Sequence, residues 1–467
     1  MLSSSHRAWK LIIVQKRFFM IFIKSISQIL SENSPINLDL KCENGFIYNE
    51  NIDSRLYLTF HQNTVIITDN INELKNIALL HIDKDAAEFY LRYGFIVPPF
   101  TLYKDVYLLA PYLGFSLTSP GVFTTQYPPI SNSIISEENC CYELAKNIKE
   151  SLDAEHGKYQ VLFSGGIDSS LLLGLSHEMA KTSVAINCHM SSMPEESEKA
   201  KKMCESKKIA FKKFAVRDDL TAVARHFIDY TAEPVADRIA LVIPEMLAAL
   251  EGGTTKVILD GQGADSLFCG LPHDKLYDLF NNDAYRYLAK IMGWLPACNN
   301  KNSAIGRKLY RIAKVIKCLS APNPIDMLIR SLIEDNSSTL SGNNKVQRWL
   351  TEELWCIDSK LVDFHLTMRY FFLFRVLPAR EMQKYALAKK KGYAFKLPFL
   401  EKSIISKYFY LRLSLCVQDG VYKYPIVFLA KKYWPGYIGA SQTSPFQVEF
   451  KTGTMTVRDF SLSHISR

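Results

Sequence analysis

Hydrophobic and polar positions follow two different patterns along this chain of 467 residues. Before about residue 130, short apolar runs alternate with turn residues, and Leu56–Phe60 and Val65–Thr68 flank a polar turn as the arms of a hairpin would. Further strand-like apolar pieces lie at Tyr90–Val97 and Val106–Leu113, among Pro-Pro and Pro-Gly pairs. We therefore expect a small β-rich domain over residues 1–135.

After a polar stretch at 131–139, strand and helix patterns alternate, which is typical of a parallel sheet with crossover helices. The expected strands are 160–163, 183–188, 210–214 and 256–260, and the helices between them are 169–179, 195–207 and 239–250. Amphipathic helical patterns follow at 283–292, 303–318, 346–355 and 358–377. The sequence therefore predicts an α/β domain with a parallel sheet over residues 136–467.

A tight loop of small residues, Ser164-Gly165-Gly166-Ile167-Asp168-Ser169, joins the first of these strands to a helix. The glycines allow a sharp turn and a close approach to a ligand, and the helix N-terminus supplies free N–H groups and a positive dipole end. A polyphosphate would fit such a loop. Because its charge repels phosphate, Asp168 is interpreted as a ligand of a Mg²⁺ ion that bridges the phosphate oxygens.

A second glycine-rich loop, residues 260–265, follows the last expected strand and contains Asp265. Neighbouring strand ends of a parallel sheet would bring Asp168 and Asp265 to one crevice, where they could share a magnesium ion. Neither loop has the lysine of the G-x-x-x-x-G-K-[ST] motif, so transfer of the γ-phosphate is not the first expectation. For either loop alone, an ordinary strand-to-helix turn is the alternative.

The first loop resembles the signature of the ATP-pyrophosphatase family, and residues 261–270 resemble the asparagine synthetase signature G-x-G-x-D-x-x-F-x-G. The resemblance implies an adenine-nucleotide α-hydrolase-like (PP-loop) synthetase fold and an ATP- and Mg²⁺-dependent, amide-bond-forming ligase that releases AMP and pyrophosphate. The residues that it implies for nucleotide binding are Ser164, Gly165, Gly166, Ile167, Asp168, Ser169, Asn187, Asp260, Gly261, Gln262 and Gly263.

Two departures from asparagine synthetases bear on the nucleophile. Residues 101–111 resemble the tail of the glutaminase domain of those enzymes, yet Leu2 follows Met1 where that domain needs a cysteine. The β-rich domain is therefore expected to be a degenerate glutaminase-like domain. Gln262 also stands where asparagine synthetases carry a glutamate that acts on ammonia. We expect an amine that the substrate itself brings.

Over residues 159–440 the chain is most similar to the macrolactam synthetases that close lasso peptides, of the microcin type. This resemblance implies adenylation of an Asp or Glu side chain of a ribosomal precursor peptide and attack by the peptide's N-terminal amine. It also implies a companion leader peptidase and a leader-binding protein. The alternatives are an asparagine synthetase-like amidotransferase and a β-lactam synthetase-like enzyme. Residues 396–400 and the helix opened by Tyr424-Pro425 extend the resemblance, although packing explains them equally well.

The family's late R-x-K-x-x-F segment corresponds to residues 441–446, which contain no lysine. Lys423, Lys431 and Lys432 are candidates for the missing cation, and each can also be interpreted as a surface charge. Glu233 is a candidate for binding or deprotonating the amine, whereas Asp237 can equally be a helix N-cap. The catalytic residues that we expect are Asp168, Asp265, Glu233 and Lys423.

The composition of the chain narrows the classes of protein to which it can belong. Hydrophobic residues make up 48% and charged residues 22% of the chain, which is ordinary for a globular protein. The net charge of +9 is scattered over several segments, so nucleic-acid binding is not expected. The ten cysteines form no C-x-x-C pair, which favours reduced thiols in a cytoplasmic protein. The uncharged apolar run at 18–23 is too short for an integral membrane span.

Overall fold

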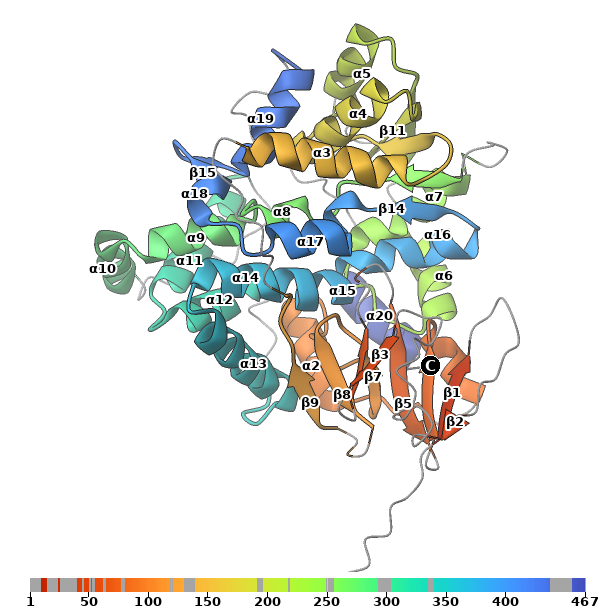
Figure 1. Ribbon diagram of the computed structural model, residues 1–467. Helices are drawn as coiled ribbons and strands as arrows, with labels where there is room; N and C mark the ends of the chain where they lie inside the picture. The colour runs from red at the N-terminus through yellow and green to blue at the C-terminus, as the bar shows by residue number, and fades with distance from the viewer. Residues whose placement is uncertain are drawn as a thin grey trace, which may run out of the picture.

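The computed structural model describes the greater part of the chain, and the ranges that it describes are 10–14, 24–25, 40–43, 46–49, 52, 55–61, 64–76, 80–117, 119, 121–129, 139–190, 196–216, 219–248, 250, 256–292, 304–334, 340–436 and 456–466. The β-rich N-terminal part lies at one end of the molecule, and the helices α3, α4, α5 and α19 lie at the other (Figure 1). Within these ranges, no helix has both the length and the apolar character needed to cross a bilayer.

Five parallel strands form the central sheet, in the order β12-β11-β10-β13-β14. Their bounds are β10 (Tyr159–Leu162), β11 (Thr182–Met190), β12 (Phe211–Val216), β13 (Val257–Leu259) and β14 (Ala394–Lys396). The order reverses between β10 and β13, and ligands of open α/β sheets bind at such a switch point. The predicted α/β pattern is confirmed, with β14 as an additional strand.

Helices pack around this sheet and are α3 (Cys140–Asp153), α4 (Ile167–Glu178), α5 (Glu196–Ser206), α6 (Thr221–Thr231), η2 (Arg238–Leu241), α7 (Ile243–Ala248) and α19 (Tyr424–Tyr433). The single helix expected at 239–250 is divided into η2 and α7. Pro244 lies in the first turn of α7, where its missing N–H costs no intrahelical hydrogen bond.

The remaining helices form a second group and are α8 (Ala264–Leu267), α9 (Pro272–Phe280), α10 (Asp283–Met292), α11 (Ala304–Leu319), α12 (Pro324–Leu332), α13 (Lys345–Leu361), α14 (Phe364–Phe371), η3 (Phe372–Val376), α15 (Leu377–Ala379), η4 (Glu381–Tyr385), α16 (Ala386–Lys390), η5 (Pro398–Leu400), α17 (Lys402–Tyr408), α18 (Leu413–Cys416) and α20 (Val457–Ile465). The helix expected at 358–377 begins later. Val362 has a φ of 59° and ends α13, and the Asp363 carboxylate then caps α14.

The N-terminal part contains two sheets, in the orders β2-β1-β6-β5-β7 and β3-β4-β8-β9. Their strands are β1 (Lys10–Val14), β2 (Lys24–Ser25), β3 (Leu40–Glu43), β4 (Phe46–Asn49), β5 (Tyr57–His61), β6 (Thr64–Thr68), β7 (Val106–Leu108), β8 (Leu113–Ser116) and β9 (Phe123–Thr125), with η1 at Ile71–Asn76. The predicted hairpin is confirmed as β5 and β6. The strand-like interpretation of Tyr90–Val97 is wrong, because Tyr90 lies in α2 (Lys84–Tyr93), which Asp83 caps and Gly94 ends.

One hydrophobic core joins the two predicted domains. Phe89 and Leu108 from the N-terminal part share a buried cluster with Met327, Val346 and Phe371 from the helical part. Helix α20 also returns from the C-terminal end to contact α2 and α6. Residues 130–138, which contain the expected boundary and most of the expected linker, lie outside the described ranges. The boundary at 135 therefore stays a prediction.

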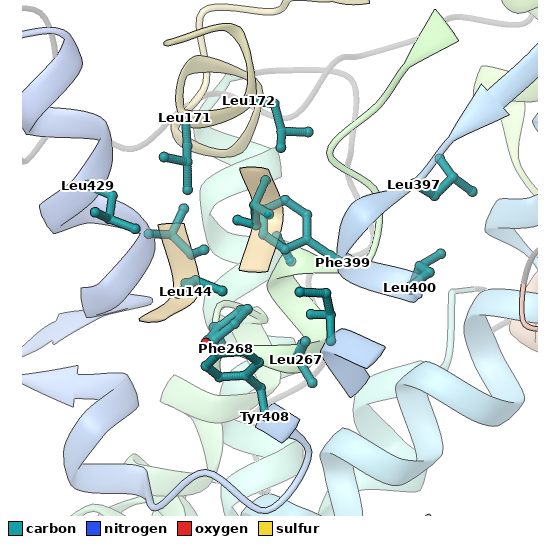
Figure 2. Close-up of a cluster of buried hydrophobic side chains, with 14 of the residues drawn as sticks. Leu144, Leu171, Leu172, Leu267, Phe268, Leu397, Phe399, Leu400, Tyr408 and Leu429 are labelled. Atoms are coloured by element: carbon teal, nitrogen blue, oxygen red, sulfur yellow. The ribbon is translucent and has the colours of Figure 1, made fainter. Parts of the chain in front are cut away.

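A second core holds the helices that follow the two glycine-rich loops. Figure 2 shows Leu171 and Leu172 of α4 close to Phe399 of η5, with Leu267 and Phe268 beside them. The rings of Phe268 and Phe399 meet edge to face, with centroids 6.2 Å apart. Phe399 is fully buried, which supports the packing role considered for residues 396–400. This core fixes the position of both loops.

Candidate active site

The first loop is shaped by its own glycines and hydroxyls. Gly165 has a φ of 75°, which glycine adopts without steric cost. The Ser164 hydroxyl accepts a hydrogen bond from the Gly166 N–H (3.2 Å), and Ser169 Oγ donates to the Gly166 carbonyl (3.1 Å). Gly166 is the N-cap of α4 and has no side chain to cap it. The first N–H groups of α4 are therefore available to an anion.

The second loop lies directly against the first. A Cβ atom at Gly261 would lie 3.0 Å from Asp168 Cβ, so only glycine permits this approach without a shift of its neighbours. Gly263 has a φ of 96° and lies under the Leu400 side chain, whose Cδ2 would be 2.2 Å from an added Cβ. The two loops thus meet at the switch point between β10 and β13, as the sequence predicted.

Asp168 and Asp265 converge on one cation, which is the ammonium of Lys423. Lys423 Nζ lies 2.5 Å from Asp168 Oδ1 and 2.8 Å from Asp265 Oδ1. Lys423 is buried, so its interpretation as a surface charge is wrong, whereas Lys431 and Lys432 are exposed. The structure therefore brings together three of the four expected catalytic residues.

A short hairpin places Lys423. Strands β15 (Val417–Gln418) and β16 (Val421–Tyr422) are joined by Asp419 and Gly420, which have φ values of 50° and 74°, as a tight two-residue turn requires. Lys423 then forms the N-cap of α19. Gly270 gives its side chain room, because an added Cβ would lie 2.1 Å from Lys423 Cδ and 2.5 Å from Asp265 Oδ1. The Asp419-Gly420 pair is the sequence signal for this hairpin.

In this cluster, the pKa of Asp168 and the pKa of Lys423 each depend on the neighbouring charges. Burial raises the pKa of Asp168 to about 6; Lys423 opposes this shift, and the charge of Asp265 adds to it. Burial alone would lower the pKa of Lys423, but the two carboxylates outweigh it and raise that pKa above its ordinary value. Lys423 is therefore a cation at neutral pH. The two hard carboxylate oxygens that meet here are also the donor type that Mg²⁺ prefers, so the residues present fit this ion.

A second polar network surrounds the start of the second loop. Lys384 Nζ lies 3.1 Å from Asp260 Oδ2, which also accepts a hydrogen bond from the Tyr385 hydroxyl (2.6 Å). The Gln262 amide lies between two charges, because its Oε1 accepts from Lys384 (2.5 Å) and its Nε2 donates to Glu381. The η4 residues of this network follow the loop by more than a hundred positions and form no motif, so the sequence alone did not indicate them.

The charges of this network also respond to burial. Burial raises the pKa of Glu381 above its ordinary value, although Arg380 and Lys384 oppose the shift. Burial would lower the pKa of Lys384, but Asp260 and other nearby acids raise it. Lys384 is therefore positively charged beside the loop, where it can compensate Asp260 or an anionic ligand.

The family comparison agrees with this geometry. The profile of the family described as "Asparagine synthase" matches residues 143–466. The chain belongs to the asparagine synthase family. A similar curated protein is "Asparagine synthetase [glutamine-hydrolyzing] 1" of Bacillus subtilis (strain 168), which is 25% identical over 245 residues. The match covers 48% of this chain and 35% of that relative, so the chain spans about a third of the relative's length.

In this asparagine synthase family member, Asn187 occupies β11 beside the first loop. Its Nδ2 donates to the Phe163 carbonyl (2.8 Å). Its Oδ1 is buried without a hydrogen-bond partner in the described part of the protein, and buried acceptors of this kind are rare. A ligand donor would satisfy it, which fits the nucleotide-binding role that the resemblance implies for Asn187.

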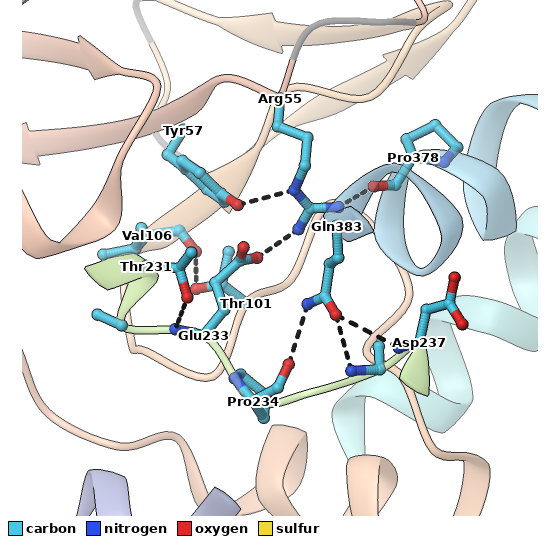
Figure 3. A network of polar contacts seen from close by, with 12 residues as sticks. Arg55, Tyr57, Thr101, Val106, Thr231, Glu233, Pro234, Asp237, Pro378 and Gln383 are labelled. Carbon is cyan, nitrogen blue, oxygen red and sulfur yellow. Dashed lines mark hydrogen bonds and ion pairs between the residues drawn. The ribbon is translucent and has the colours of Figure 1, made fainter. Parts of the chain in front are cut away.

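Glu233 belongs to a different polar cluster from Asp168, Asp265 and Lys423. Its carboxylate pairs with the Arg55 guanidinium, which also donates to the Pro378 carbonyl (Figure 3). Arg55 comes from the N-terminal part, so this pair joins the two halves of the protein. Asp237 caps η2, with Oδ1 accepting from the Ile239 N–H (3.0 Å), as the alternative interpretation predicted.

Proposed function

We propose that this asparagine synthase family protein is an ATP-dependent ligase that adenylates a carboxylate, forms an amide bond and releases AMP and pyrophosphate. The observation that carries the proposal is the convergence of Asp168 and Asp265 on one cation at the switch point of the sheet. Paired carboxylates beside a phosphate-binding loop suit a magnesium polyphosphate. The exposed N–H groups of α4 suit the phosphates themselves.

The roles of this chain's own residues follow from their charges. The first loop would hold the phosphates through backbone N–H groups, and Lys423 would stabilise negative charge as the α–β bridge breaks. Asp168 and Asp265 would hold magnesium, which when bound neutralises the leaving pyrophosphate. Little acid–base chemistry is needed for this step, because the attacking carboxylate is already ionised and needs only to be positioned.

We further propose that the activated carboxylate is an Asp or Glu side chain of a ribosomal precursor peptide and that the peptide's N-terminal amine closes a macrolactam. Gln262 supports this choice, because the resemblance places an ammonia-directing glutamate there and an amide cannot take that role. Holding the amine beside the acyl carbon is worth on the order of 7 kcal/mol or more for well-oriented groups. A leader peptidase and a leader-binding protein in the cytoplasm complete the proposal.

Exchange of radiolabelled pyrophosphate into ATP tests the ligase. We expect exchange that depends on the carboxylate substrate, formation of AMP and not ADP, and a loss of at least about a hundredfold in Asp168→Asn and Asp265→Asn, since each removes a charge from the cluster. Asp283→Asn is the matched control, because the Asp283 side chain is fully exposed. Undiminished exchange in both active-site variants would contradict the ligase.

Two forms of one precursor peptide separate the lasso proposal from the amidotransferase alternative. A peptide with a free N-terminus should support exchange and then lose one water on ring closure. The N-acetylated peptide should support exchange without ring closure, because its amine cannot attack. Exchange that responds only to free aspartate, with asparagine formed from ammonia, would contradict the lasso proposal and leave the ligase in place.

A further inference from the structure

Three buried side chains, Cys269, Asp274 and His365, meet directly after the second loop, and the Cys416 side chain lies beside that of Cys269. Cys269 follows α8, Asp274 lies in α9, His365 in α14 and Cys416 in α18. Their exposed fractions are 2%, 3%, 6% and 0%. The Cys269, Asp274 and His365 side chains each place one potential ligand atom within 4.8 Å of the other two. The proposed nucleotide chemistry uses none of these four residues.

The orientation of His365 and Asp274 is fixed from outside the cluster. His365 Nε2 lies 3.3 Å from Asp278 Oδ1, and Nδ1 faces Asp274 Oδ1 at 3.4 Å. Histidines that bind metals commonly donate their second ring N–H to a carboxylate, which fixes the tautomer. Asp278 Oδ1 can accept a hydrogen bond from the Nε2–H, which leaves the Nδ1 lone pair for a metal. Asp274 Oδ2 accepts from the Leu271 N–H (3.0 Å), so its Oδ1 is the oxygen that faces His365.

The two sulfur atoms share one cationic donor. Arg369 Nη2 lies 3.3 Å from Cys269 Sγ and 3.5 Å from Cys416 Sγ, and Arg369 is itself buried. The guanidinium thus places one positive charge beside both sulfur atoms. Cys269 also has a φ of 56°, a backbone conformation that glycine adopts without steric cost. The presence of a cysteine here, despite this strain, indicates a role for its side chain.

We propose that Cys269, Cys416, His365 and Asp274 bind a zinc ion. Two thiolates, one imidazole and one carboxylate are a donor set that suits zinc, whereas Mg²⁺ and Ca²⁺ prefer oxygen donors alone. The charges of this arrangement cancel, because a divalent cation and the Arg369 guanidinium oppose two thiolates and one carboxylate. The ligands are far apart in the sequence, which explains why no metal-binding spacing was visible in it.

The position of this site indicates a structural role for the ion. Cys269 immediately precedes Gly270, which gives Lys423 its room, and Cys416 immediately precedes the β15–β16 hairpin that carries Lys423. A zinc ion would therefore tie both segments to α9 and α14. With four protein ligands the site is closed to substrate, so the ion would contribute to folding and not to the reaction.

Metal content and the cobalt spectrum test this proposal without any activity assay. Protein loaded with zinc and dialysed against metal-free buffer should retain one equivalent per chain. Apo protein titrated with Co²⁺ should develop near-ultraviolet thiolate-to-cobalt bands and the strong visible bands of tetrahedral cobalt. Absence of retained zinc, or a cobalt spectrum without thiolate bands, would overturn the proposal.

Variants locate the ion. Cys269→Ser and Cys416→Ser should each lower zinc retention by at least about tenfold and weaken the thiolate bands. His365→Gln should also lower retention, because the amide cannot replace the ring nitrogen. Cys204→Ser is the control, since Cys204 is equally buried but lies in α5. Circular dichroism checks the fold of each variant, and unchanged zinc stoichiometry in folded Cys269→Ser and Cys416→Ser proteins would overturn the proposal.

Discussion

At the scale of single residues, the raised pKa of Asp168 predicts how activity depends on pH. A carboxylate binds magnesium only when it is ionised, and with a pKa of about 6 the ionised fraction falls as the pH drops from 7 to 5. Pyrophosphate exchange should therefore fall across this range, whereas an aspartate of ordinary pKa would stay ionised. Lys423→Met should move the midpoint to higher pH, because Lys423 opposes the shift. A flat profile between pH 5 and 7 in folded protein would contradict this assignment.

Gly270 provides a second test at this scale. Gly270→Ala places a Cβ 2.1 Å from Lys423 Cδ, so the ammonium must leave its position between the two carboxylates. We expect pyrophosphate exchange to fall by at least about tenfold, which corresponds to about 1.4 kcal/mol in the transition state. Gly342→Ala is the matched control, because an added Cβ there meets nothing within 4 Å. Equal exchange rates in the two variants would exclude this role for Gly270.

At the scale of elements, the close packing of α4 on α19 connects the first loop to Lys423. A Cβ at Gly174 of α4 would lie 2.5 Å from Tyr433 Cγ of α19. Alanine is better than glycine in a helix by about 1 kcal/mol, but overpacking costs about 1–3 kcal/mol. Since the clash is with atoms near the backbone, we expect Gly174→Ala to be destabilising by about 1 kcal/mol in urea unfolding.

The Tyr433→Ala background provides the control for this pair. In this background the Tyr433 ring is absent, so Gly174→Ala should lower the free energy of unfolding by less than it does in the native chain. Pyrophosphate exchange should change in parallel, because α19 begins at the residue after Lys423. An equal loss of unfolding free energy in both backgrounds would mean that the Tyr433 ring does not clash with a side chain at position 174.

The elements also differ in how far the sequence could predict them. The two loops were predictable because strand, glycines and aspartate are contiguous in each, and the hydrophobic pattern gave four of the five parallel strands. Strand β14 (Ala-Phe-Lys) contains only one large apolar residue and forms no apolar run, whereas the equally short β13 is Val-Ile-Leu. Tyr90 was misassigned because aromatic residues favour strands in isolation, whereas Asp83 and Gly94 set the limits of a helix around it.

The site was less predictable than the loops, since its other residues come from remote segments. Lys423 resembled a surface lysine until packing placed it between Asp168 and Asp265. Glu381 and Lys384 follow no motif, and only the fold places them beside Gln262. Local chemistry is visible in one sequence, but a contact between distant segments becomes visible only once the fold is known.

At the scale of the whole molecule, the Arg55–Glu233 pair predicts how the two halves depend on each other. Both side chains are 9% exposed. Figure 3 shows the contact that joins them. Arg55→Met leaves the Glu233 carboxylate buried without its partner, and such a loss costs about 3–5 kcal/mol. We expect the midpoint of urea unfolding to fall accordingly. The double variant Arg55→Met/Glu233→Leu should recover a large part of this loss, because no charge is then left buried.

The same variants examine the expected catalytic role of Glu233. If the residue only joins the two halves, the folded double variant should keep its pyrophosphate exchange and its ring closure. Loss of ring closure with retained exchange in that variant would instead support the prediction that Glu233 acts on the amine.

The position of Lys423 has a consequence for how the resting protein meets its nucleotide. Its ammonium offsets one of the two aspartate charges, so the pair attracts stray divalent ions less strongly than two unpaired carboxylates would. In the proposed reaction, Asp168 and Asp265 would hold magnesium in place of the ammonium, and Lys423 would turn to the phosphate oxygens. Once the products leave, Lys423 would return to its position between the two carboxylates.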